Sequence, residues 1–494
     1  MKHVIKTIAF VLIAAVVILV LNKRIEPKFI YSNSFWPVTS TYEQFYEMEK
    51  NSVDVIFLGS SVVENAFIPQ TMYDTYGIRS YNLGSEQQSI LLSWWWLNEA
   101  LKYQSPKVVV LDSRFLFPIH EENPINTVET LTRKCIDPMR FSANKIKAVH
   151  DICTRDPSQN ELSYYLTNIR YHDRWTELAP EDIDKTAYRP AQLKGYGIST
   201  LAAAGEWVPF VPQDTDAREE VDPLMKEYLD KIKDLLAERG IKLILISLPG
   251  DDFTEAMQNT VAEYAEQTGT DYYNFNREDI INAIGAELPA ENVLIHMNLQ
   301  GAAKTSNWFG GVLSEQYGVP SVSDSQWEET EAFYQQAVLG ANVQRATDVY
   351  AYLNTIAFGD YTIFMSGKED CSSALDQNLQ YLLFQLGIMN EIPPGDSFCA
   401  ILSKDNQQMA IGDEDQTLDG VIKNSAGILV DYHIGSGGSF ASHSSTIVIN
   451  GKEYSCNDAG LNIVIYDNLR NMVIDSVCFN TGIPEHTCTK KGSL

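Results

Sequence analysis

Two residues far apart in the chain have side chains suited to acyl-transfer chemistry. Ser61 follows the short apolar segment Val53–Gly59, which is typical of a buried parallel strand. A strand-to-helix turn here would expose the hydroxyl and direct N–H groups of the helix N-terminus at a developing oxyanion. His296 stands in the segment IHMNLQGAAKTS, before an asparagine, a glycine and a run of small residues, where a lone histidine is usually structural. Ser61 is thus a candidate nucleophile, while the alternative is a serine that serves only the turn and the helix cap.

Alternating strand-like and helix-like segments between Val53 and about Gly318 predict an α/β domain with a parallel sheet. Ligands of such sheets bind outside the carboxyl ends of the strands, where Ser61 falls. The residues Trp94 to Trp96 diverge by about 100° each on a helix, so we expect them to pack rather than to line a groove. Further strands are predicted at Ser80–Gly84, Lys107–Ser113, Ile241–Ser247 and Asp271–Phe275, and helices at Ser89–Tyr103, Pro223–Gly240 and Thr254–Thr268.

Three further segments divide the chain. Residues 115–221 are irregular and aromatic-rich, and are predicted to form an insertion or lid. Residues 329–348 are predicted to be a helical connector. Residues 349–484 are rich in strand-like segments, with Asn450-Gly451 as a hairpin turn signal, and predict a C-terminal α+β or β-sandwich domain.

The N-terminal residues 1–25 contain an apolar run, Thr7–Leu21, between basic residues, and no small-residue cleavage site follows it. This pattern predicts an uncleaved signal anchor, and hence a single-pass protein of the cell membrane. Basic residues on both sides of the run leave its orientation open.

Composition excludes several classes of ligand. The 37 Lys+Arg against 65 Asp+Glu give a formal charge of -28, so a nucleic acid is not an expected partner. The seven cysteines form no C-x-x-C pair and show no metal-ligand spacing with histidine, so we expect neither a metal nor another cofactor.

The blocks FLGSSVV, YNLGSEQQ and HMNLQGAAK occur in this order along the chain. Together they resemble the SGNH/GDSL hydrolases, in particular the membrane-anchored branch with DltD-like and AlgX-like proteins that act on cell-surface polymers. The resemblance covers about Val53–Tyr317 and implies an SGNH hydrolase domain over residues 50–328 with a flavodoxin-like parallel sheet. It also implies Ser61 as nucleophile, His296 as base and Gly84 as an oxyanion donor.

Two positions depart from this resemblance. The family usually places an aspartate three residues before the histidine to hold its tautomer, and Val293 stands there. Glu291 is the alternative candidate for the orienting acid. The asparagine of the third family block is also missing, and Asp112 stands near its place.

The C-terminal segment GLNIVIYDNLRNMVIDSVCFNTG resembles the closing segment of the interleukin-like EMT inducer (ILEI, or PANDER) domain. This resemblance spans about Val349–Gly482 and implies an extracellular domain that binds carbohydrate or a partner protein. Asp370, Asp467 and Asp475 could face a ligand, although acidic residues beside turns usually cap them.

These features predict a membrane-anchored, extracytoplasmic serine esterase or O-acyltransferase that acts on a cell-surface glycan or glycopolymer. One alternative is a non-catalytic surface binding protein with a degenerate hydrolase domain, because Val293 stands at the acid position. Another is a scaffold for a membrane acyltransferase partner.

Overall fold

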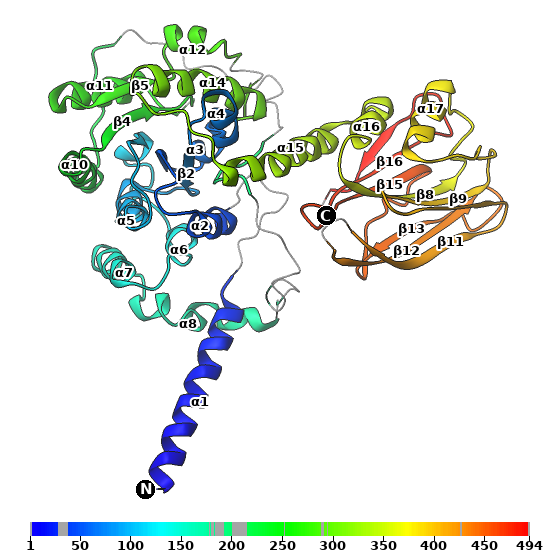
Figure 1. The fold of residues 1–494 in the computed structure, drawn as a ribbon, viewed down its shortest axis with the longest axis horizontal. Coiled ribbons are helices and arrows are strands. Elements are labelled where there is room, and N and C mark those ends of the chain that lie inside the picture. Colours follow the sequence, from blue (N-terminus) through cyan, green and yellow to red (C-terminus); the bar gives the residue numbers. More distant parts are fainter. Residues whose placement is uncertain are drawn as a thin grey trace. The chain divides into compact units, whose positions relative to one another are not determined.

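The chain folds into two compact units, Met1–Glu331 and Ala332–Leu494. They are seen in a computed structural model that describes residues 2–27, 38–176, 178, 182, 192–199, 215–250, 252–287, 291–293, 295–424 and 427–492. The division lies inside helix α15 (Ser325–Arg345), which overlaps the connector predicted at 329–348 (Figure 1).

The first unit is built on a five-stranded sheet whose paired strands are all parallel, as the apolar segments predict. Its strand order is β2-β1-β3-β4-β5, the order of flavodoxin-like doubly wound sheets. Each strand begins and ends within two residues of its predicted limits. The strands are β1 (Val55–Gly59), β2 (Ser80–Gly84), β3 (Val108–Asp112), β4 (Lys242–Ser247) and β5 (Asp271–Asn274).

Helices cover both faces of this sheet. Successive side chains of each strand point to opposite faces, so the apolar strands present apolar side chains on both of them. On one face, Ile56 and Leu58 of β1 belong to a core shared with α5 (Ile90–Ala100), α10 (Pro223–Glu238) and α11 (Glu255–Thr268). On the other face, Phe57 packs against Phe67 and Phe309, and the latter comes from α14 (Leu299–Glu315). Helix α4 (Pro69–Tyr76) packs against α14 on that side (Figure 1).

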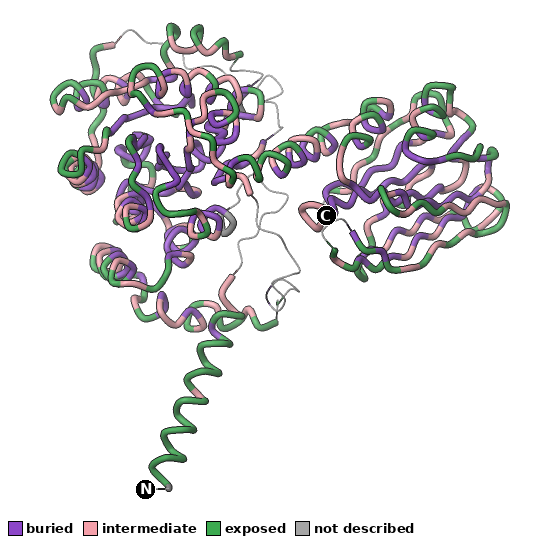
Figure 2. The backbone as a smooth tube through the Cα atoms, viewed as in Figure 1, coloured by how far each residue is buried: buried purple, intermediate pink, exposed green. Residues whose placement is uncertain are grey.

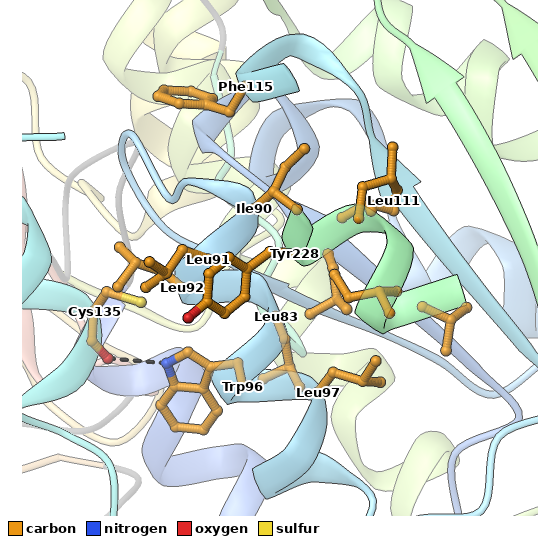
Figure 3. Packing of buried hydrophobic residues seen from close by; sticks show 14 of the residues in the cluster. Leu83, Ile90, Leu91, Leu92, Trp96, Leu97, Leu111, Phe115, Cys135 and Tyr228 are labelled. Atoms are coloured by element: carbon orange, nitrogen blue, oxygen red, sulfur yellow. Dashed lines mark hydrogen bonds between the residues drawn. The ribbon is translucent and has the colours of Figure 1, made fainter. Parts of the chain in front are cut away.

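The tryptophan run packs in the interior, as predicted. Trp96 is fully buried, and its indole N–H donates to the Cys135 carbonyl oxygen over 3.0 Å (Figure 3). Its ring stacks on Tyr42 with centroids 4.1 Å apart. Trp94 and Trp95 are partly buried against the same core, so the run stabilises α5 and lines no site.

Residues 129–176 of the predicted insertion are mainly helical and include α6 (Glu129–Ile136), α7 (Ala143–Arg155), η2 (Glu161–Tyr164), α8 (Asn168–Tyr171) and η3 (His172–Thr176). Helices α6 and α7 pack on α5, so this part extends the core on one face of the sheet. Residues 192–199 and 215–221 are described without helix or strand, and residues 177, 179–181, 183–191 and 200–214 of the predicted lid lie outside the described residues.

The second unit contains a mixed sheet of ten strands in which β12 pairs with β8 in parallel and the other pairs are antiparallel. The strands are β8 (Tyr361–Glu369), β9 (Ser397–Leu402), β10 (Gln407–Gly412), β11 (Gln416–Lys423), β12 (Leu429–Gly438), β13 (Ser445–Ile449), β14 (Lys452–Glu453), β15 (Gly460–Asp467), β16 (Met472–Phe479) and β17 (Cys488–Lys490). Asn450 and Gly451 have φ of 49° and 80°, which confirms the predicted hairpin turn.

The sheet curls over an apolar core that joins β11, β12 and β13 to β8, β9 and β15. Helices α16 (Val349–Ile356) and α17 (Gln377–Leu386) belong to a second core on the other face of the central strands (Figure 1). The unit is thus an α+β structure.

Helix α1 (Lys2–Ile25) is longer than the predicted apolar run at both ends. Within the described residues it is the one helix long and apolar enough to cross a membrane, and no part of its apolar window is buried. Figure 2 shows it as an almost entirely exposed helix. Its length and composition therefore suit a membrane anchor.

Candidate active site

The structure brings the two predicted residues together. Ser61 Oγ lies 2.9 Å from His296 Nε2, although 235 positions separate them in the sequence. Ser61 is the first residue of α3 (Ser61–Ala66), directly after β1, and His296 begins the short strand β7 (His296–Met297). Both residues thus lie at the carboxyl edge of the parallel sheet. A hydroxyl within hydrogen-bond reach of an imidazole nitrogen is the arrangement of a nucleophile and its general base.

Two glycines shape the turn that carries Ser61. Gly59 has φ of +155°, and a Cβ there would lie 2.7 Å from Cβ of Asp112, so a side chain is excluded. Gly84 pairs with Gly59 across β1 and β2. A Cβ on Gly84 would lie 3.1 Å from the Ser60 carbonyl oxygen. The predicted oxyanion donor therefore packs directly against the turn that holds Ser61.

The His296 loop is fixed at both ends. β7 pairs with β6 (Asn292–Val293), and Val293 is the backbone partner of His296 in this hairpin. Asn298 then caps α14, because its side-chain oxygen accepts from the N–H groups of Gln300 and Gly301 over 3.1 Å each. The asparagine two residues after the histidine thus starts the helix that anchors the loop.

Burial and the charge of Arg114 lower the pKa of His296 to about 4, while Glu86 and Asp252 act in the opposite direction. The imidazole is therefore neutral at neutral pH and free to accept a proton. Such a base is available over a wide pH range, but it is weaker than an unperturbed histidine.

Two ion pairs near His296 were not predicted from the sequence. Arg114 is buried and pairs with the half-exposed Asp252. Lys134 Nζ lies 2.8 Å from Glu86 Oε2. One sequence signal could have placed Arg114 near the site. Arg114 comes two residues after the end of β3, and the carboxyl ends of neighbouring parallel strands meet at the edge of the sheet that carries Ser61.

Two buried acids flank the turn. Burial raises the pKa of Asp112 to about 6, against the opposing charge of Arg114. Glu64 lies one helical turn after Ser61, and its Cγ would lie 3.2 Å from a Cβ on Gly84. Burial raises the pKa of Glu64 well above its ordinary value, and its carboxyl oxygens accept no hydrogen bond from any residue that the structure describes. Burial therefore favours the protonated form of this carboxyl group beside the site.

Glu291, the candidate orienting acid, is engaged by other groups. Its Oε1 lies 2.5 Å from Lys304 Nζ, and its Oε2 accepts from the Glu287 N–H over 2.7 Å. The carboxylate therefore ties the residues before β6 to α14. Its role as the orienting acid of His296 stays a prediction.

The acidic residues singled out in the second unit also have structural partners. Asp370 Oδ1 accepts from the N–H groups of Ser372 and Ser373, over 3.0 Å each. Asp467 and Asp475 pair with Arg470 and Lys490 over 2.8 and 2.7 Å. In the part of the chain that the structure describes, no group of three or more histidine, cysteine or acidic residues could hold a metal ion.

A scan against protein-family models finds no model that matches this chain, and a search of curated proteins finds no significant match.

Proposed function

We propose that this chain is a membrane-anchored, extracytoplasmic serine esterase or O-acyltransferase that acts on an acylated cell-surface glycan. The observation that carries the proposal is the 2.9 Å contact between Ser61 Oγ and His296 Nε2 at the carboxyl edge of a parallel sheet. Helix α1 supports the membrane location. The second unit, with its ILEI-like sequence, would hold the glycan or a partner such as a membrane acyltransferase.

The proposed reaction uses these groups in two steps. Ser61 Oγ attacks the acyl carbon while His296 Nε2 takes its proton. The N–H groups of Ser61 and Gly84 hold the oxyanion. That of Ser61 is available because the first N–H groups of a helix have no partner within it, and that of Gly84 comes from the end of β2 beside the turn. His296 then returns the proton to the departing alcohol, and water or an acceptor hydroxyl releases the acyl group from Ser61.

Labelling by a fluorophosphonate tests this proposal on the full chain in detergent. Intact mass is expected to show one adduct on the wild type and none on Ser61→Ala or His296→Ala. Ser60→Ala is the matched control, because Ser60 is a buried neighbour whose side chain makes no capping bond. Its labelling should equal that of the wild type.

Turnover of acetylated glycans by the unlabelled wild type, and its absence in Ser61→Ala, would then define the substrate. A folded wild-type chain that takes no label, or a Ser61→Ala variant that labels normally, would exclude serine catalysis. That outcome would favour the surface binding protein, for which the engaged carboxylate of Glu291 is the supporting observation.

A further inference from the structure

The end of α1 is attached to the first unit through a segment of the predicted insertion. Asn22 is the first polar residue after the exposed apolar side chains that run to Leu21. Its Oδ1 accepts from the Asn168 N–H over 2.7 Å, and its carbonyl oxygen accepts from Thr167 Oγ1 over 3.2 Å. Arg174 Nη1 donates to the Ile25 carbonyl oxygen over 2.7 Å. Residues 167–176, here called the juxtamembrane segment, are thus bonded near both ends to the last residues of α1.

The juxtamembrane segment exposes large apolar side chains at this place. Ile169 is 39% exposed and Trp175 is 67% exposed. Figure 1 shows α8, which belongs to this segment, beside the end of α1. An isolated exposed apolar residue is ordinary on a protein surface, but these two lie on a segment bonded to the end of an apolar helix.

The length of α1 indicates at which level of the bilayer the juxtamembrane segment lies. The hydrocarbon core of a bilayer is about 30 Å thick, which about 20 helical residues span at about 1.5 Å per residue. If Leu21 is the last residue in the hydrocarbon, Asn22 stands at its boundary with the headgroups. The bonds of Asn22 to Thr167 and Asn168 place the juxtamembrane segment at the same level. Tryptophan is enriched at this level of membrane proteins, since its ring is apolar and its N–H is polar.

We propose that the juxtamembrane segment lies on the bilayer, with Ile169 and Trp175 in the headgroup region of the leaflet where α1 ends. The partner is the lipid interface itself. This inference rests on α1 as a membrane anchor and is independent of the chemistry at Ser61. The first unit would then contact the membrane through both α1 and the juxtamembrane segment.

Photo-crosslinking to lipid tests this placement on the full chain in vesicles of phosphatidylethanolamine and phosphatidylglycerol. The photoreactive residue p-benzoylphenylalanine replaces Ile169 or Trp175, and lipid adducts are measured by peptide mass spectrometry. Leu19 of α1 is the position for the positive control. Asn282 of α12 (Glu278–Ile284) is the negative control, because it is an exposed residue of the first unit and α12 lies at the end of that unit away from α1 (Figure 1).

Adducts are expected at positions 169, 175 and 19, and none above background at position 282. Adducts at position 19 alone would overturn the proposal while keeping the anchor. Absence of adducts at position 19 would overturn both. Where a crosslinking variant fails to fold, quenching by brominated lipids replaces it. The quenched part of the tryptophan emission should fall in Trp175→Phe and stay unchanged in Trp308→Phe, and an equal effect of the two would also overturn the proposal.

Discussion

The charge of Arg114 acts directly on the imidazole of His296, whose pKa it helps to lower to about 4. Arg114 is buried at the end of β3 and its partner Asp252 follows β4, so one ion pair joins two loops at the edge that carries Ser61. Burial is the main cause of the low pKa, and the charges on these two loops also contribute to the basicity of the residue that would accept the serine proton.

Arg114→Gln is expected to raise the pKa of His296, because a charge that opposes protonation is removed. The neutral imidazole is the active form, so activity in the wild type should rise with pH through about 4. We call this rise the acid limb of the pH profile. In Arg114→Gln the acid limb should move to higher pH, since His296 stays protonated up to a higher pH. The initial rate of fluorophosphonate labelling, measured from pH 3.5 to 8, gives the limb directly.

Asp252→Asn is the matched variant with the opposite sign. Asp252 raises the pKa of His296, so its neutralisation should move the limb to lower pH. A shift in the same direction for both variants would mean that loss of the Arg114–Asp252 ion pair, rather than the charge of either residue, determines the pH at which the labelling rate rises.

Gly59→Ala is expected to destabilise the first unit by about 1–3 kcal/mol, because φ of +155° is unfavourable for alanine. The added Cβ would also lie 2.6 Å from Val63 Cγ2 and 2.7 Å from Asp112 Cβ, which adds to this cost. The measurement is the free energy of unfolding from urea denaturation. Gly285→Ala is the comparison variant, because Gly285 has φ of +69° and, among the residues that the structure describes, no atom lies within 4 Å of the added Cβ. A loss in Gly59→Ala no larger than that in Gly285→Ala would contradict the expected extra cost at Gly59.

The elements of the sheet could be predicted because their signals are local. Buried parallel strands give short apolar runs, and Asp222-Pro223 gives a cap and a first helical residue, since Asp222 accepts from the N–H groups of Leu224 and Met225. Ser61 and His296 could be named for the same reason, because each stands at a recognisable boundary between a strand and a helix.

The surroundings of His296 could not be predicted, because they depend on distances between loops. Arg114 and Asp252 are 138 positions apart, and nothing in either segment indicates their ion pair. Glu291 was a reasonable orienting acid by its sequence distance from His296. Its engagement by Lys304 and the Glu287 N–H follows from how the loop meets α14, which the sequence pattern does not contain.

Glu64→Gln is expected to remove a pH dependence of stability. Burial raises the pKa of Glu64 in the folded state above its unfolded value of 4.5. Its contribution to stability is therefore fully present below about pH 4.5 and is lost as pH rises toward the folded-state pKa, because the unfolded state alone is then ionised. The glutamine has the same shape and does not titrate. The difference in the free energy of unfolding between Glu64→Gln and the wild type should thus grow in favour of the variant from pH 5 to 8. A constant difference across this range would show that Glu64 is ionised in the folded state.

Asn298→Ala tests whether the cap of α14 positions His296. Loss of the two bonds from Gln300 and Gly301 is expected to cost about 0.5–2 kcal/mol of stability. It should also slow fluorophosphonate labelling under conditions where the protein stays folded, because the cap lies two residues after the base. Ser142→Ala is the matched control, since Ser142 caps α7 through the Lys145 N–H over 3.3 Å. Both variants should lose stability, but only Asn298→Ala should label more slowly. Equal labelling rates in the two variants would show that β6 and β7 hold His296 without the cap.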